Sequence, residues 1–489
     1  MNKLICFCLS AFVAFGASAQ SKPKSTAADA LMKRVHAAMG DAQISSLAFT
    51  ASGTGATFGQ AYTPSLPWPK ITYSNFARHY DYANAAMGEE AARSRAEPNG
   101  GGAVPLIGTG EQKTSARLSG EFAWNLTPNP TAAPLTVSAR IHDLWTSPNG
   151  VLRAAANYKP VLKKVSINKQ PMTTLSFTVP GRFAAVVYIN NKNMVVGVDS
   201  VQPSPVLGDT ATTTWYDDYK DYGGVKFPSR IRQEMAGHPV LDVTVSDVKI
   251  NTPLETAVPD AVRNFKENVT AEKAADTNGL GVWFLAGGSH NSVLIEMVDH
   301  AVLVEAPLYD GRSLAVLAKA KEVLPTKPVR YVVNSHHHFD HAGGLRTAAA
   351  AGLTLVTSAA AKPYFEKAIA NPNRLSPDAL ATSNAKWSIE GVDGKRVMTS
   401  GSRTIEMMEI KDSVHALGFM MVYLPQEKIL IEADAYTPGA PNAPAPARVN
   451  DNHVNLANNI ATQGLQVARI LPLHGRMVDV AELNRAIGK

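Results

Sequence analysis

Cysteine is almost absent from this chain of 489 residues, which contains only Cys6 and Cys8. A disulfide framework is excluded, because it needs several cysteines spaced along the chain. Beyond residue 8 the sequence also offers no thiolate as a metal ligand. Stability must therefore come from hydrophobic cores, and a chain of this length has room for two ordinary domains.

Runs of basic residues and long apolar segments are missing as well. The net charge of +6 is modest for the length, and no Lys/Arg cluster suggests a nucleic-acid track. The apolar stretch at residues 4–15 is too short to cross a membrane. We therefore expect no nucleic-acid partner and no transmembrane segment.

The N-terminus has the pattern of a secretory signal peptide. Lys3 precedes the apolar stretch, and Ala17 and Ala19 form a small-residue cleavage site. The predicted signal spans residues 1–19, with the cut after Ala19. Both cysteines would be removed with it. We expect a periplasmic or secreted protein.

Potential metal ligands are concentrated in residues 334–344. The pattern H-x-H-x-D-H is formed there by His336, His338, Asp340 and His341. Residues two apart point to the same side of an extended chain but not of a helix. The β-branched run at 329–333 predicts a buried strand, and residues 345–351 favour a helix. The cluster is therefore expected on a loop at a sheet edge, with His337 in a packing or supporting role.

Three residues downstream could complete a site for two metals. Such a site needs about three more protein ligands, one of them able to bridge. Asp434 and His474 each follow an apolar run that reads as a buried strand, and His415 is the third candidate. Each would be weak evidence alone, because a single histidine is more often structural.

The ordered ligand set resembles the metallo-β-lactamase fold superfamily, over about residues 272–489. The stretch 282–295 looks like the first hairpin of that domain. The resemblance implies a C-terminal αββα sandwich. It assigns one metal to His336, His338 and His415, a second to Asp340, His341 and His474, and a bridging role to Asp434. The Cys-using β-lactamase subclass does not match, because no cysteine is available.

Two divalent metal ions are the expected cofactors. Zinc is favoured for a His-rich site with carboxylates, although iron and manganese use similar ligands. A hydroxide shared by the two metals would attack an ester, lactone, thioester or related bond. Asp340 is predicted to be catalytic, because it would orient that hydroxide.

Four further residues are candidates for substrate contact: His290, Asn291, Tyr436 and His453. For each, a structural role is an equal alternative. The Pro-rich segment 438–446 is either a lid beside the site or a surface connection.

The first half of the chain, residues 20–260, is predicted to be rich in strands. Examples are 135–145, 163–179, 183–198 and 241–250, with a leading helix from about Ser25 to Met39 that ends at Gly40. The segment 212–228 turns at Gly223-Gly224.

This half resembles periplasmic lipoprotein-carrier-like domains, which implies a concave antiparallel sheet able to hold an apolar chain. A domain that only stabilises or docks is the favoured alternative, because any curved sheet needs an apolar inner face.

The sequence thus predicts an α+β protein of two domains: a curved antiparallel sheet with a leading helix, a linker at 261–280 and a hydrolase domain at 281–489. The leading hypothesis is an exported dinuclear metal-dependent hydrolase that acts on a small-molecule or lipid-like substrate. One alternative is a periplasmic β-lactamase like subclass B3. Another is a carrier of lipophilic ligands with a non-catalytic metal site.

Overall fold

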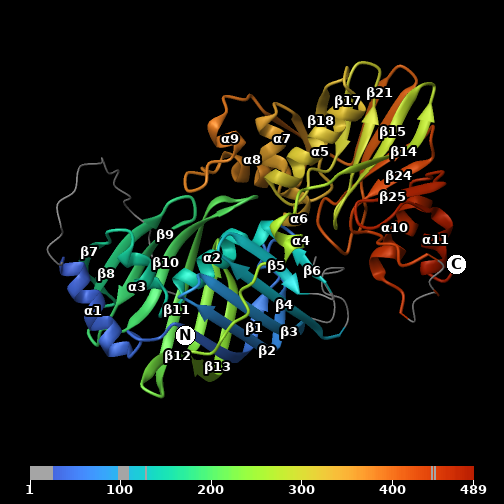
Figure 1. The fold of residues 1–489 in the computed structure, drawn as a ribbon. Coiled ribbons are helices and arrows are strands. Elements are labelled where there is room, and N and C mark those ends of the chain that lie inside the picture. Colours follow the sequence, from blue (N-terminus) through green and yellow to red (C-terminus); the bar gives the residue numbers. More distant parts are fainter. Residues whose placement is uncertain (1–25, 97–109, 127–128, 442–443, 445–447) are drawn as a thin grey trace.

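The computed structural model describes residues 26–96, 110–126, 129–441, 444 and 448–489. The predicted signal peptide lies outside the described residues. The described chain forms two domains (Figure 1), one built on residues 26–250 and the other on residues 270–489. Among the described residues, none of the helices combines the length and apolarity needed to span a bilayer.

The first domain is built on one sheet of 13 antiparallel strands, in the order β6-β5-β4-β3-β2-β1-β13-β12-β11-β10-β9-β8-β7. The strands are β1 Ser46–Ala56, β2 Lys70–Asp81, β3 Ala86–Arg95, β4 Gln112–Ser119, β5 Phe122–Leu126, β6 Pro130–Ala132, β7 Val161–Ile167, β8 Gln170–Val179, β9 Phe183–Ile189, β10 Val195–Ser204, β11 Gly208–Tyr222, β12 Val225–Met235 and β13 His238–Ile250.

Helix α1 (Ala27–Met39) is defined at both ends by its sequence. The hydroxyl of Thr26 accepts from the backbone of Asp29, whose carboxylate accepts from the backbone of Thr26, forming a capping box. Gly40 ends the helix with a φ of 70°, a conformation that favours glycine. The predicted leading helix is confirmed.

The prediction of a strand at residues 135–145 is wrong, because this segment is helical. The structure has a short 3₁₀ turn (η1, Pro134–Thr136) followed by helix α2 (Val137–Thr146). Val137, Ile141 and Leu144 recur at helical spacing, and the last two are buried against the sheet. Helix α3 (Val151–Ala156) packs beside α2 in the same core.

Two other predicted strands are each two strands joined by a turn. The segment 163–179 turns at Asn168 and Lys169, whose positive φ angles suit a two-residue hairpin. The segment 183–198 turns after β9 and continues as β10. The predicted turn at Gly223-Gly224 is confirmed between β11 and β12.

The second domain contains two sheets, and its strands begin earlier than predicted. The first has the order β14-β15-β16-β17-β18-β19-β20 and the second β21-β22-β23-β24-β25-β26. The first comprises β14 Thr270–Thr277, β15 Leu280–Ala286, β16 Ser292–Glu296, β17 Ala301–Val304, β18 Val329–Val333, β19 Thr354–Ser358 and β20 Ser388–Val392. The second comprises β21 Lys395–Ser400, β22 Arg403–Glu409, β23 Met420–Leu424, β24 Ile429–Glu432, β25 Arg469–Pro472 and β26 Val478–Asp479.

The predicted linker at 261–280 therefore contains structure. Strand β14 lies inside it and pairs with β15, and the short helix α4 (Asp260–Arg263) overlaps its start. The predicted hairpin at 282–295 is present as the pair β15–β16.

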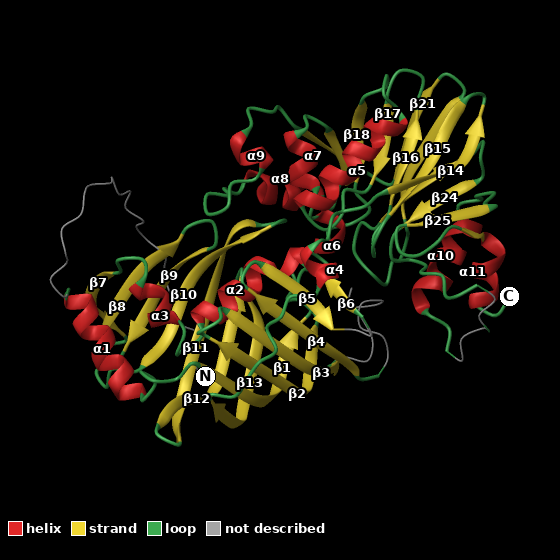
Figure 2. Ribbon diagram, in the orientation of Figure 1, coloured by secondary structure: helices red, strands yellow, loops and turns green. Residues whose placement is uncertain are grey.

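The two sheets of the second domain share one core. Val293 and Val304 of the first sheet lie in the same buried cluster as Met407 and Ile431 of the second. Helices lie on both sides of the sheets (Figures 1 and 2). On one side are α5 Asp310–Val323, α7 Leu345–Ala350, α8 Lys362–Ala370 and α9 Ala379–Thr382, and on the other α10 Asp451–Thr462 and α11 Val480–Ala486.

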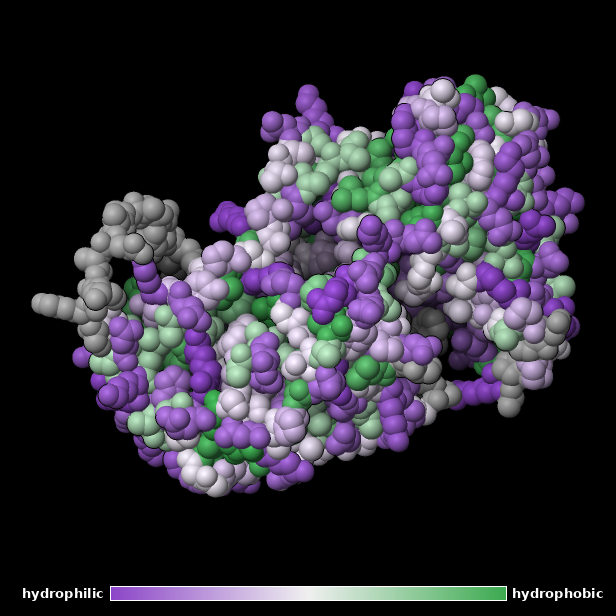
Figure 3. Space-filling view, viewed as in Figure 1, coloured by the Kyte–Doolittle hydropathy of each residue, from purple (hydrophilic) through white to green (hydrophobic). Residues whose placement is uncertain are grey.

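The domains meet near helix α6 (Phe339–Ala342) and at the tip of the β10–β11 hairpin (Figure 1). At the hairpin, the backbone N–H of Asp209 donates to the carbonyl of Pro372 at 2.8 Å. The carboxylate of Asp209 accepts from the backbone of Arg374 at 3.0 Å. The face shown in Figure 3 is hollowed where the domains meet, and hydrophilic and hydrophobic side chains are mixed over this face.

Candidate metal centre

The potential ligands gather where strands of both sheets end. The segment with the H-x-H-x-D-H pattern follows β18, which lies between the parallel neighbours β17 and β19. Asp434 follows β24, and His474 follows β25, its parallel neighbour. His415 lies between β22 and β23. Because parallel strands end at the same edge of a sheet, residues far apart in sequence meet at this edge.

The structure brings all seven predicted ligands together in two groups. In each group, one potential ligand atom per residue lies within 4.8 Å of the others. The first group is His336, His338, His415 and Asp434, and the second is His290, Asp340, His341 and His474. His290, which the sequence suggested for substrate contact, stands here among potential metal ligands.

Asp434 lies between the groups and turns one oxygen to each. Its Oδ2 lies 2.8 Å from Nε2 of His415 and 3.5 Å from Nε2 of His336. Its Oδ1 lies 2.8 Å from Nε2 of His474 and 3.3 Å from Nε2 of His341. This is the arrangement required of a carboxylate that bridges two cations.

The potential ligand atoms are placed better for binding cations than for hydrogen-bonding to one another. Both oxygens of Asp434 are buried, and neither has a partner with hydrogen-bond geometry in the described part of the chain. The Nε2 atoms of His336 and His415 face each other at 3.2 Å, and those of His341 and His474 at 3.1 Å. Nitrogen and carboxylate oxygen are ligands that zinc and related divalent ions accept.

Metal binding needs neutral imidazoles and ionised carboxylates, and the pKa shifts of His336, His338 and Asp434 suit it. The pKa of His341 is instead raised well above its usual value, because the carboxylates of Asp434 and Asp340 lie beside it and outweigh burial. Burial lowers the pKa of His336 and of His338 well below the usual value. Burial would raise the pKa of Asp434, but the neighbouring His341, His415 and His474 together outweigh it and hold that pKa well below its usual value.

Glu305 supports this centre, although sequence reasoning missed it. It is fully buried just after β17 and has a φ of 74°. Its Oε2 accepts from Oγ of Ser335 at 2.6 Å and lies 3.0 Å from Nδ1 of His341. A carboxylate behind a ligating imidazole fixes the ring and its tautomer. The available signal was its place directly after an apolar run, as for Asp434.

The side chain of Asn291 holds the segment around His474 in place. Its Nδ2 donates to the carbonyls of Pro472 at 3.3 Å and Gly475 at 2.8 Å, on either side of His474. The ring of His474 is fixed further by Ser289, whose carbonyl lies 3.0 Å from its Nδ1.

Tyr436 and His453 pack against each other, with ring centroids 4.9 Å apart. Neither belongs to the two groups of potential ligands. His453 lies in the first turn of helix α10. Of the Pro-rich segment 438–446, residues 442–443 and 445–446 lie outside the described residues.

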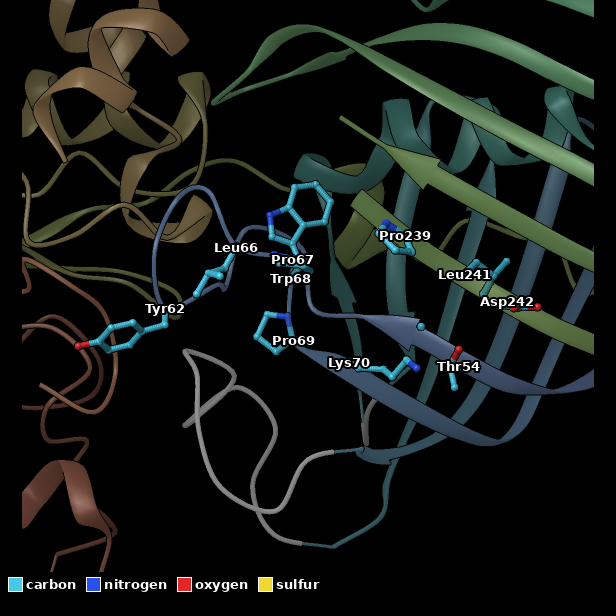
Figure 4. A pocket seen from close by; sticks show the side chains of 11 residues that line it. Thr54, Tyr62, Leu66, Pro67, Trp68, Pro69, Lys70, Pro239, Leu241 and Asp242 are labelled. Carbon is cyan, nitrogen blue, oxygen red and sulfur yellow. The ribbon is translucent and has the colours of Figure 1, made fainter. Parts of the chain in front are cut away.

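A groove of about 470 Å³ lies on the first domain, beside the loop of residues 57–69 (Figure 4). Its lining is Thr54, Gly55, Tyr62, Leu66, Pro67, Trp68, Pro69, Lys70, Pro239, Leu241 and Asp242. Tyr62 extends from this loop toward the second domain. The volume lies within the range of small-molecule sites.

Three solved structures each resemble a part of this chain. A metallo-beta-lactamase from Pontibacter korlensis is 17% identical, with 45% of this chain and 97% of that chain covered and a TM-score of 0.34. The metallo-beta-lactamase FIM-1 from Pseudomonas aeruginosa is 18% identical, with 46% of this chain and 94% of that chain covered and a TM-score of 0.32. A flavo di-iron protein mutant from Thermotoga maritima is 13% identical, with 46% of this chain and 62% of that chain covered and a TM-score of 0.34.

No curated protein sequence matches the chain significantly. Residues 285–435 match the family model of the metallo-beta-lactamase superfamily. This range contains every predicted metal ligand except His474, which lies beyond its end. The second domain of this chain is therefore a metallo-beta-lactamase superfamily domain.

Proposed function

We propose that the protein is a dinuclear metal-dependent hydrolase that cleaves an ester, lactone, thioester or related bond. One observation supports this most strongly: Asp434 directs its two oxygens to two separate histidine groups. A structural zinc site needs only one closed set of four ligands. Two joined sets, placed where strands end, suit hydrolytic chemistry better.

Two divalent ions at such a site would supply Lewis acidity and lower the pKa of water to about 7. We favour zinc. The residues of the chain would hold these ions and orient the attacking water. Asp340 accepts at Oδ1 from Gln60 and lies at Oδ2 3.1 Å from Nε2 of His290. Both carboxylate oxygens are thereby fixed, which suits a group that orients the attacking water.

The proposal includes export to the periplasm or beyond, a substrate that is a small or lipid-like molecule, and an αββα arrangement of the second domain. A carrier function of the first domain has less support. Helices α2 and α3 pack on the face where an apolar ligand would lie. A cavity there, lined by Phe49, Tyr80 and Asp143 among others, has a volume of only about 20 Å³.

Metal analysis and a hydrolysis panel test the proposal together. We expect two bound divalent ions per chain and turnover of at least one ester, thioester, lactone, β-lactam or phosphodiester. Asp340→Asn should abolish that turnover. A protein with both metals and no turnover across the panel would instead favour a carrier, and hydrolysis of a chromogenic cephalosporin would identify a β-lactamase.

A further inference from the structure

A loop of the first domain reaches the ligand-bearing segments of the second. It joins β1 to β2 and spans residues 57–69 (Figure 4). Four consecutive residues of this loop, 59–62, each contact the segment 337–340 or Leu417, which lies two residues after His415. The last of these contacts is a hydrogen bond from the backbone N–H of Leu417 to the carbonyl of Tyr62 at 2.8 Å.

Gln60 makes the most direct of these contacts. Its side chain is buried, with an exposed fraction of 2% for the residue, and its Nε2 donates to Oδ1 of Asp340 at 2.8 Å. The other oxygen of Asp340 faces His290 at 3.1 Å and His341 at 3.7 Å. Gln60 therefore fixes the rotation of the Asp340 carboxylate, so that one oxygen is turned toward His290 and His341.

The carbonyl of Ala61 orients two histidines of the motif. It lies 2.9 Å from Nε2 of His337 and 3.0 Å from Nε2 of His338, and its two lone pairs can accept from both. With Nε2 of His338 donating, Nδ1 is left as the unprotonated nitrogen. That Nδ1 is buried and has no partner among the described residues, as expected of an atom reserved for a metal.

Gly59 and Trp68 seat the loop on Phe339, the residue between His338 and Asp340. Gly59 has a φ of 68°, and a Cβ built there would lie 2.1 Å from the Phe339 ring. The Trp68 ring meets Phe339 edge to face, with centroids 5.6 Å apart. Glycine is required at position 59 by both its conformation and this close approach.

We propose that the metal centre is shared between the domains, with Gln60 as a positioning residue that orients Asp340. The loop from the first domain supplies the outer hydrogen bonds that the second domain does not provide for Asp340 and His338. This inference rests on the proposed function, because it presumes that the two groups bind metal. It gives the first domain a role in the centre itself.

The test compares full-length variants by metal binding, with no need of a substrate. Gln60→Met keeps the side-chain length but removes the donor, and Gln60→Ala removes both. Ser65→Ala is the matched control, because Ser65 is exposed in the same loop and its hydroxyl hydrogen-bonds to Thr63 of that loop. Bound zinc is measured by elemental analysis across a chelator series, and Co²⁺ absorption spectra report the ligand geometry.

Loss of an outer-shell partner weakens metal binding by about 10- to 100-fold. We therefore expect both Gln60 variants to lose one of two zinc ions at chelator concentrations that leave the parent and Ser65→Ala fully loaded. The Co²⁺ spectrum should change with that loss. Chelator curves and spectra of Gln60→Met that match the parent would overturn the inference.

Gly59→Ala tests the loop without touching a hydrogen-bonding group. The added methyl must displace the loop from Phe339, so it should weaken zinc binding in the same chelator series while circular dichroism stays unchanged. A parent protein that binds no metal would refute the proposed function. Two metals in the parent with unaffected Gln60 and Gly59 variants would refute only the shared centre.

Discussion

Some residues of this centre are potential metal ligands, and others make hydrogen bonds to those ligands. Glu305 is of the second kind. Its carboxylate lies behind Ser335 and His341 and is fully buried. The charged oxygen favours a proton on Nδ1 of His341, which leaves Nε2 free for a metal.

Replacing Glu305 by Gln should therefore weaken metal binding by about 10- to 100-fold while keeping the shape of the side chain. Chelator competition measures this effect. Asp393→Asn, in an exposed turn of the same domain, should leave metal binding unchanged. Equal affinities in Glu305→Gln and the parent would show that the buried carboxylate serves packing only.

The sequence predicted seven potential ligands because their spacing and strand-end positions carry a local signal. It assigned His290 to substrate contact, since a single histidine on a hairpin carries no spacing. Gln60 and Glu305 were missed for a physical reason. Each contacts the motif through the folded chain, with 280 residues between Gln60 and Asp340 and 36 between Glu305 and His341.

At the level of secondary structure, helix α2 is attached to the first sheet by a charged pair. The guanidinium of Arg78 lies 2.9 Å from Asp143 on α2 and 2.7 Å from Glu89 on β3. Burial would raise the pKa of Asp143, but Arg78, His142 and Arg140 together outweigh it and the pKa is lowered.

A carboxyl with a lowered pKa stabilises the fold above its unfolded-state value, here 3.8, and loses that effect as the pH falls through the folded-state pKa. Asp143→Asn should cost about 1–3 kcal/mol at pH 6, because Arg78 loses a charged partner. Urea unfolding at pH 6 and pH 3 measures both effects. The variant should lose less stability on acidification than the parent, and equal losses would contradict the assignment.

Helix α2 also shows where pattern reading fails. Residues 135–145 contain apolar residues that fit a strand over short windows, and only the spacing of Val137, Ile141 and Leu144 distinguishes a helix. The long hairpins were easier to predict, because turns such as Gly223-Gly224 are explicit in the sequence. The pairing of thirteen strands into one sheet rests on contacts that no local pattern encodes.

For the molecule as a whole, the proposed metal binding should be coupled to folding, because the potential ligands lie on segments between strands of two sheets and some of their outer contacts come from the other domain. A ligand that binds only the folded state stabilises it by about 2.7 kcal/mol at 100 times its Kd. Excess chelator should therefore lower the Tm by several degrees, and added zinc should restore it. A Tm that is insensitive to chelator would mean that no metal is bound tightly.

The division into two domains could be predicted from the sequence, but their relation could not. The linker at 261–280 was expected because prolines and charged residues separate the halves, yet β14 already belongs to the second domain. Nothing in the pattern of residues 57–69 indicates that this loop meets the motif at His336 to His341. That meeting depends on how the domains dock.

A zinc titration of the metal-free protein tests whether Asp434 joins two metal sites. We predict two zinc ions per chain for the parent and loss of tight binding at both positions in Asp434→Asn, because each oxygen of Asp434 faces a different group. Two tightly bound ions in Asp434→Asn, or fewer than two in the parent, would contradict the account.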